Sequence, residues 1–162
     1  MGEGILIYGT VRGRIGKAGE KIRAVLEDIR RQGFSRAKPF TVGKVEKRME
    51  RFAESNGITL AKGGLYMTSS ALAHATRDSK KAKGLTVSGS ELASFPKRRR
   101  GMRLYYDHDV KTFLYVDGSN KYAVHPNYEV KMPNGKKKVV NFITAQKLSK
   151  DERFNGKRYE KI

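Results

Sequence analysis

Hydrophobic residues in the first third of the chain recur every three to four positions, which is the spacing of an amphipathic helix. This spacing predicts two helices, over residues 20–32 and 42–55. Residues 4–8 could instead be a short strand or a disordered start, and short strands are expected at 58–60 and 65–67. The predicted buried helix positions are Ile22, Val25, Leu26 and Ile29, followed by Val42, Val45, Met49 and Phe52.

Residues 66–83 read as the end of a strand followed by a capped helix. A hydroxyl of Thr68, Ser69 or Ser70 can accept a hydrogen bond from a free N–H of the first turn. His74, Arg77 and Lys81 follow at i, i+3 and i+7, so they share one helix face. Such a face suits phosphodiester chemistry, and it is equally the pattern of a solvated basic helix.

From residue 103 onward the period changes from helical to two, which indicates strands. Pro126 predicts a bend or an edge in the third strand, and Asn134-Gly135 favours a two-residue type I′ hairpin before the fourth. Pro96 is expected to end a short helical turn before the strands begin. The predicted strands are 103–106, 110–116, 121–130 and 138–146.

This order of elements predicts an α+β domain, in which N-terminal helices are followed by an antiparallel sheet of about four strands with helices on one face. Residues 1–60 would form a helical extension or docking segment, and residues 61–150 the main α+β domain. Residues 151–162 would form a basic tail.

The charge is the strongest compositional signal. The 162 residues contain 35 Lys and Arg against 16 Asp and Glu, a formal net charge of +19. An excess of this size indicates a polyanionic partner, most often nucleic acid, with RNA favoured here over DNA. No apolar run is long enough to span a membrane. The absence of cysteine excludes disulfides and thiolate chemistry.

Metal and cofactor chemistry find little support in the sequence. There are three histidines, and none lies at i+3 or i+4 from another. The turn around His108, between Asp107 and Asp109, could hold a metal, but Asp-rich turns of this kind are common without one. We therefore expect no metal and no cofactor.

A metal-free phosphodiesterase fits the remaining residues, because the 2′-hydroxyl of RNA supplies the nucleophile. The reaction needs a base, an acid and groups that stabilise the charged phosphate. His74 is the candidate base or acid, with Arg77, Lys80 and Thr144 as candidate stabilisers. Thr144 could equally be a hydroxyl satisfied within a sheet. The candidate nucleic-acid-binding residues are Lys81, Lys83, Lys97, Arg98, Arg99, Arg100, Tyr105 and Tyr122, although tyrosines in such strands are more often core residues.

Four features follow one another along the chain: the segment from Met67 to Arg77, the segment from Leu85 to Pro96, tyrosine-rich strands and the closing run from Asn141 to Ala145. In the order and spacing of these features, residues 64–148 resemble the phage and mobile-element branch of the barnase–EndoU–colicin–RelE-like nucleases. The resemblance implies a metal-independent, toxin-like ribonuclease with catalysis at His74, supported by Arg77 and Thr144. It also implies action in the cytoplasm of a host cell or carriage in a virion. Residues 1–60 lie outside the resemblance and are a candidate segment for contact with a protein partner or virion component.

The rival interpretation is a basic nucleic-acid-binding protein without enzymatic activity, or a nuclease fold whose site has decayed. A cluster of His74, Arg77, Thr144 and a tyrosine around one open cleft would favour the enzyme. A His74 packed under Phe95 would favour the others.

Overall fold

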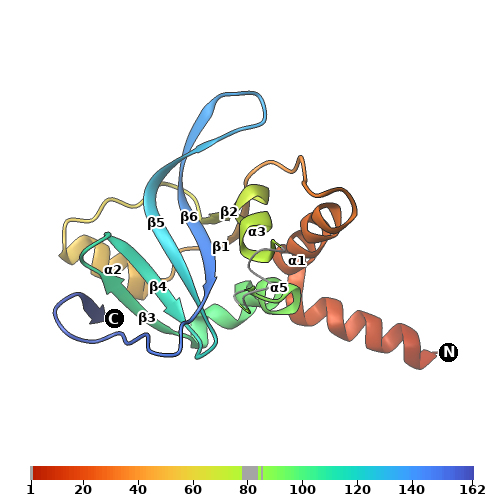
Figure 1. Cartoon of the computed structure of the whole chain (residues 1–162), viewed down its shortest axis with the longest axis horizontal. Coiled ribbons are helices and arrows are strands. Elements are labelled where there is room, and N and C mark those ends of the chain that lie inside the picture. Colours follow the sequence, from red (N-terminus) through yellow and green to blue (C-terminus); the bar gives the residue numbers. More distant parts are fainter. Residues whose placement is uncertain (1, 78–83, 85) are drawn as a thin grey trace.

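The computed structural model describes residues 2–77, 84 and 86–162 and confirms the α+β class. The described residues form four α-helices and one mixed sheet of seven strands, in the order β1-β2-β6-β5-β4-β3-β7 (Figure 1). The sheet is therefore larger than the predicted four strands. The helices and strands of the protein are α1 Gly2–Gln32, β1 Phe40–Gly43, α2 Lys47–Ser55, β2 Leu65–Met67, α3 Ser69–Thr76, α5 Gly89–Arg98, β3 Arg103–Asp107, β4 Thr112–Val116, β5 Asn120–Lys131, β6 Lys137–Lys147 and β7 Tyr159–Lys161.

The four predicted strands are the antiparallel meander β3–β4–β5–β6. Two of the additional strands precede it in the chain: β1 pairs antiparallel with β2, and β2 pairs parallel with β6. The third, β7, lies at the far edge beside β3. Each of the three additional strands is only three or four residues long, so each depends on its neighbour in the sheet rather than on a periodic pattern of its own.

Several expected boundaries change in the structure. Residues 4–8 belong to α1, whose backbone leaves helical geometry at Gly16 (φ 67°). The second predicted helix begins at Lys47, because Val42 is buried in β1. Residues 58–60 are not a strand. Pro96 lies inside α5, which continues to Arg98 and a short 3₁₀ turn.

The sheet differs from prediction at two turns as well. Val110 lies in the β3–β4 turn, 58% exposed, and β4 begins two residues later. The β5–β6 loop spans residues 132–136, and Gly135 is its one residue with positive φ. A type I′ turn needs positive φ at both central residues, so the loop is longer than the predicted two-residue hairpin.

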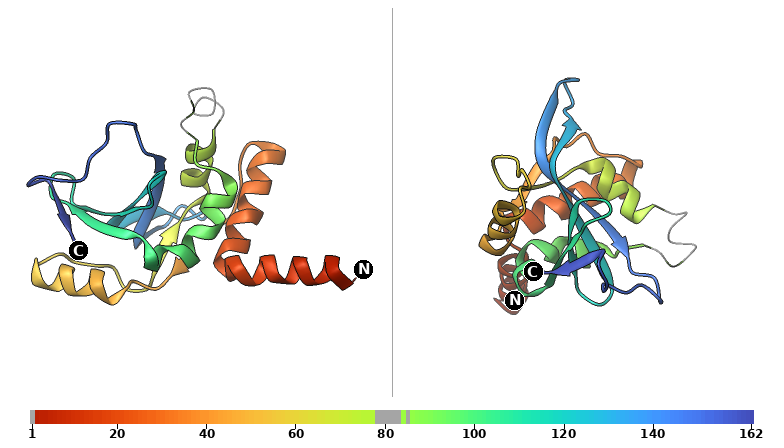
Figure 2. Two further views of the ribbon diagram at one scale, coloured as in Figure 1. Left: turned by 90° about the horizontal axis from the view of Figure 1, so that it is seen from below. Right: turned by 90° about the vertical axis from the view of Figure 1, so that its left-hand side faces the viewer.

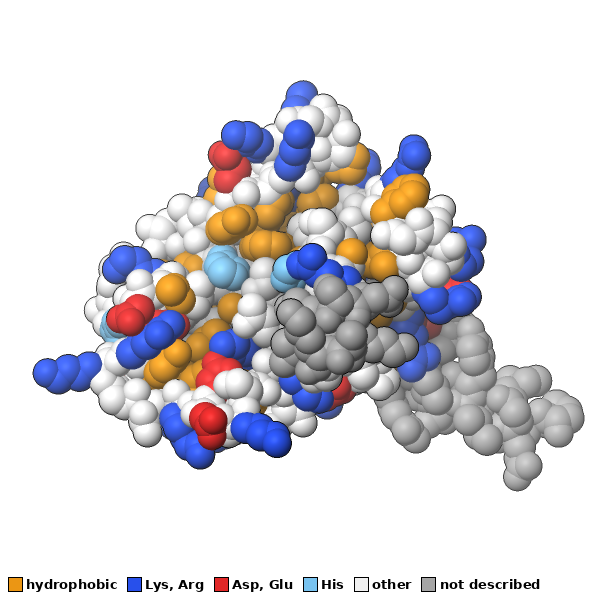
Figure 3. All heavy atoms as spheres, in the orientation of Figure 1, with side chains coloured by type: hydrophobic (Ala, Val, Ile, Leu, Met, Phe, Trp, Pro, Cys, Tyr) orange, Lys and Arg blue, Asp and Glu red, His pale blue; other side chains and the backbone are white. Residues whose placement is uncertain are grey.

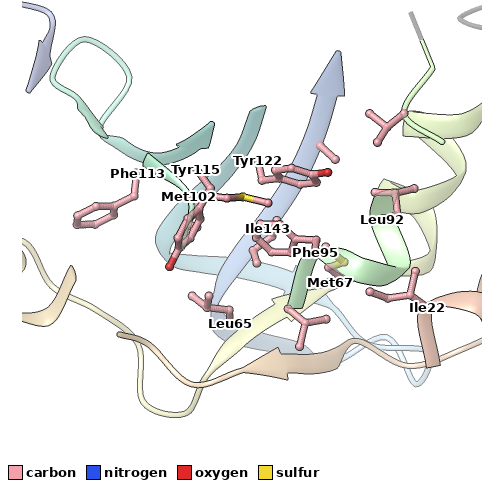
Figure 4. Packing of buried hydrophobic residues seen from close by; sticks show 14 of the residues in the cluster. Ile22, Leu65, Met67, Leu92, Phe95, Met102, Phe113, Tyr115, Tyr122 and Ile143 are labelled. Atoms are coloured by element: carbon pink, nitrogen blue, oxygen red, sulfur yellow. The ribbon is translucent and has the colours of Figure 1, made fainter. Parts of the chain in front are cut away.

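The main core lies between one face of the sheet and the helices (Figure 4). Phe95 of α5 stacks on Tyr122 of β5, with ring centroids 4.1 Å apart, and meets Tyr115 of β4 edge-on at 5.5 Å. Helices α1, α3 and α5 lie side by side beside the sheet (Figure 2). Ile22 and Met49, which both precede residue 60, belong to this same core cluster. Residues before and after position 60 therefore share one core and one sheet.

The second face of the sheet carries a smaller cluster. Tyr105, Leu114 and Val116 are buried there beneath the C-terminal segment. Phe154 stacks on Tyr105 at 5.4 Å, so the predicted basic tail supplies packing as well as charge. Within the described part of the chain, no helix is both long enough and apolar enough to cross a membrane.

Candidate functional site

Helix α3 presents His74 to solvent, and Arg77 is exposed directly after Thr76, where the helix ends earlier than the sequence predicts. The helix begins after Thr68, whose hydroxyl accepts a hydrogen bond from the backbone N–H of Ala71 at 3.1 Å. Its buried side consists of Leu72 and Ala75. Because residues three apart share a helix face, Nη2 of Arg77 lies against the His74 ring, 3.2 Å from its Nε2. His74 is exposed and is not packed under Phe95.

A groove of about 940 Å³ runs between α3 and the C-terminal half of α1. His74 and Arg77 line it from α3, while Ile29 and Arg30 line it from α1. Arg30 is held by an ion pair with Glu27. The described lining of this groove does not include Thr144, so the predicted cluster of four groups does not form within one cavity.

Thr144 is instead paired with a histidine that sequence reasoning did not select. Nε2 of His125, on β5, lies 3.2 Å from Oγ1 of Thr144, on β6. The side chain is half-buried, and this burial lowers the pKa of His125 from its ordinary value of 6.5. The imidazole is therefore neutral at pH 7 and able to accept a proton.

Aromatic rings surround this histidine. The centroid of the His125 ring lies 5.8 Å from that of Phe142 and 5.5 Å from that of Tyr128, and the last two rings stack on each other at 5.2 Å. Tyr66 of β2 lies opposite Phe142. Nζ of Lys138 lies over the Tyr66 ring, 4.8 Å from its centroid. A titratable ring, a hydroxyl and a cation thus share one aromatic face of the sheet.

The two histidine-bearing regions are neighbours in the fold. Helix α3, which carries His74, packs against β6, which carries Thr144. Figure 3 shows histidine side chains on the face where α3, β5 and β6 are exposed, with hydrophobic side chains between them and the β5–β6 hairpin. We call His74, Arg77, His125 and Thr144 the histidine site.

Two of the four residues in the predicted basic run from Lys97 to Arg100 form ion pairs within the protein. Arg99 is 3% exposed, and its Nη1 donates to Oε2 of Glu46 at 3.2 Å. Arg98 is exposed, but its Nη1 donates to Oδ2 of Asp117 at 3.1 Å. Lys97 and Arg100 are exposed. Arg99 is therefore a core residue rather than a group available to a phosphate.

The two tyrosines predicted to stack on bases are buried. Tyr122 is fully buried against Phe95, and burial raises the pKa of its phenol to about 12. Tyr105 is 7% exposed beneath Phe154. Neither ring presents a face to a ligand. The predicted residues Lys80, Lys81 and Lys83 lie outside the described residues.

The described residues include no group of three His, Asp or Glu side chains placed to hold a metal ion. The Asp107 turn is instead organised by protein contacts. Burial acts to raise the pKa of Asp107, but hydrogen bonds from Arg158 and from the amides of Asp109 and Val110 outweigh it and lower that pKa overall. The turn thus anchors the C-terminal segment.

The lowered pKa of His125 gives a direct test of the site. We expect its NMR titration midpoint to fall below 6.5, identified by loss of the resonance in His125→Gln. Below pH 6.5 the unfolded chain takes up a proton that the folded protein excludes, so the free energy of unfolding should fall as pH drops toward the folded pKa. A midpoint at or above 6.5 would contradict the burial of this ring.

Comparisons with known proteins identify no similar protein. No protein-family model matches the chain, and no curated protein or solved structure matches it significantly. The functional argument therefore depends on the residues and geometry described above.

Proposed function

We propose that the protein is a metal-independent endoribonuclease that cleaves structured RNA, such as tRNA, through a 2′,3′-cyclic phosphate. One observation carries the proposal: a neutral imidazole, His125, lies 3.2 Å from the Thr144 hydroxyl on a half-open aromatic face. The neighbouring helix supplies a second imidazole and a guanidinium, His74 and Arg77. The net charge of +19 favours a polyanionic substrate.

The His125–Thr144 pair can perform the first proton transfer. In the tautomer that carries its proton on Nε2, His125 donates to Oγ1 of Thr144, and Nδ1 holds the lone pair that accepts a proton from the 2′-hydroxyl. The Thr144 hydroxyl hydrogen is then free to donate to a phosphate oxygen. Burial lowers the pKa of His125, so the unprotonated ring that a general base needs is its prevailing form at pH 7.

The groups on α3 supply the remaining roles. His74 would give a proton to the departing 5′-oxygen from a ring nitrogen, and Arg77 would stabilise the negative charge that builds up on the phosphate. Attack by the 2′-oxygen forms the cyclic phosphate as the bond to the 5′-oxygen breaks. The sequence places Lys80 close after this helix, and it remains a candidate for the same charge stabilisation.

The test uses the purified protein in excess EDTA with labelled tRNA and with single-stranded DNA of matched length. We expect RNA cleavage that leaves 2′,3′-cyclic phosphate ends, with the DNA left intact. Once a cut is mapped, a single 2′-deoxy substitution on its 5′ side should stop cleavage there, because the nucleophile is gone. Tight binding that weakens with salt, without cleavage, would instead identify a non-enzymatic nucleic-acid-binding protein.

A further inference from the structure

Strand β5 contains an irregularity that changes which side chains face the histidine site. His125 lies opposite Phe142, and Tyr128 lies opposite Val140, so the register shifts between them. Residues three apart in a regular strand point to opposite faces. The shift, at Pro126 and Asn127, instead places His125 and Tyr128 on the same face, with their rings 5.5 Å apart.

This bulge is held in place by specific contacts. Asn127 has φ 53°, a conformation that is uncommon for a non-glycine residue. Its backbone N–H donates to Oδ1 of the buried Asn141 at 3.2 Å. Oδ1 of Asn141 also accepts from the N–H of Ala61 at 2.8 Å, which ties the bulge to the segment before β2. β-Bulges commonly re-aim side chains near functional sites.

The consequence is an exposed aromatic ring in a polar setting, where the one carboxylate of the groove lining, Glu129, is paired with Lys137 at 3.2 Å. Tyr128 is 45% exposed although Phe142 stacks on it, so part of the ring remains open to solvent. Both rings line a groove of about 680 Å³ formed by the loop before β1, the start of α3 and the β5–β6 hairpin. Arg36 and Lys131 also line this groove, as do the hydroxyl residues Thr68 and Ser69.

We infer that this groove, which we call the Tyr128 groove, binds an unpaired nucleobase of the RNA, stacked on Tyr128. The open part of the ring offers a π-surface to a base, and Arg36 and Lys131 offer positive charge to the flanking phosphates. Bases inside a continuous duplex are already stacked and cannot reach such a ring, so single-stranded segments and loops are the matching substrate class.

The inference deepens the proposed function and rests on it for one point only, namely that the bound base lies next to the cleaved phosphate. That point follows from the position of His125, which contacts the rings of both Phe142 and Tyr128. The β5–β6 hairpin projects beyond the rest of the sheet, with basic side chains near its tip (Figures 1 and 3). An RNA loop seated in the groove would lie against this hairpin.

The experiment measures binding without cleavage. A fluorescent single-stranded oligonucleotide with 2′-O-methyl groups throughout has no free 2′-hydroxyl and cannot be cut by the proposed reaction. We expect Tyr128→Ala to weaken its binding by about 5- to 150-fold, the effect of losing one base–aromatic stack. Tyr128→Phe keeps the ring and should bind nearly as well as the wild-type protein. A duplex of the same sequence should bind both Tyr128 variants equally.

Two controls distinguish stacking from indirect effects. Val139→Ala removes another exposed hydrophobic side chain of the same hairpin, 46% exposed, and should leave binding unchanged. Oligonucleotides with a single abasic position, scanned along the strand, should include one that weakens binding to the wild-type protein but not to Tyr128→Ala. Thermal melting of each variant checks that the fold is retained.

Equal affinity of Tyr128→Ala and the wild-type protein would overturn the inference, as would abasic effects that are the same in both. These outcomes are independent of catalysis. If the protein cleaves no RNA but binding depends on Tyr128 as described, the nuclease proposal fails and the base-binding groove stands. If cleavage occurs without any dependence of binding on Tyr128, the opposite holds.

Discussion

Replacing His125 by alanine is expected to lower kcat/KM for RNA cleavage by about 10²- to 10⁴-fold, the usual contribution of a positioned general base. The change removes the imidazole whose Nε2 lies 3.2 Å from Oγ1 of Thr144, and with it the proposed proton acceptor for the 2′-hydroxyl. The measurement is the initial cleavage rate of labelled RNA in EDTA at pH 7, compared with the rate of the wild-type protein.

The two remaining histidines provide the matched variants. His74→Ala should cause a loss of similar size, because His74 supplies the proton for the leaving oxygen. His108→Ala should retain the wild-type rate, since His108 lies in the β3–β4 turn and contacts Glu160 at 2.9 Å. Circular dichroism establishes that each variant is folded. Wild-type activity in His125→Ala would rule out its role as the base.

The second large effect concerns stability. Glu46→Ala is expected to lower the free energy of unfolding by about 3–5 kcal/mol, because it leaves the buried Arg99 without its carboxylate. The Arg99 side chain is 4% exposed and that of Glu46 is 12% exposed. The same Oε2 of Glu46 also accepts the hydroxyl hydrogen bond of Tyr115. Burial and this hydrogen bond both raise the pKa of Tyr115. Urea unfolding at pH 7 gives the free energy directly.

Two further substitutions distinguish the stability lost by leaving Arg99 unpaired from the stability lost by changing a charge near the start of α2. Glu50→Ala removes an exposed carboxylate from the first turn of α2 and should cost less than about 1 kcal/mol. Glu46→Gln keeps a hydrogen-bond acceptor, so its loss in free energy of unfolding should lie between those of Glu50→Ala and Glu46→Ala. If Glu46→Ala unfolds at the same urea concentration as Glu50→Ala, the Arg99 ion pair does not stabilise the core.

The elements that could be predicted from the sequence are those with a strong period of their own. The strands of the meander alternate clearly, and residues 20–32 repeat at helical spacing. Strand β1 could not be predicted from periodicity, because Val42 also fits the spacing of the helix that follows. Its burial is explained by pairing with β2 rather than by any local pattern. Strand β7 is likewise only three residues long and is positioned by β3.

The histidine site likewise contains residues that could be identified from the sequence and one that could not. His74 and Arg77 could be identified because one lies in the last turn of a regular helix and the other directly follows that turn, so their spacing in the sequence makes the side chains neighbours. His125 could not, because its pairing with Thr144 depends on the register between β5 and β6. The available signal was Pro126, which predicts a break in the strand directly after His125. A strand break beside a histidine and a tyrosine is a feature that sequence reasoning can use.

The parallel pairing of β2 with β6 has a consequence for folding. Leu65 and Tyr66 meet Asn141 and Phe142, which lie far along the chain, whereas the meander between them is built from local hairpins. Contacts between distant segments form slowly, because a long loop must close before they contribute. The Tyr128 groove needs residues from both sides of this pairing. During synthesis, therefore, the chain would complete its meander before it could engage RNA in the groove.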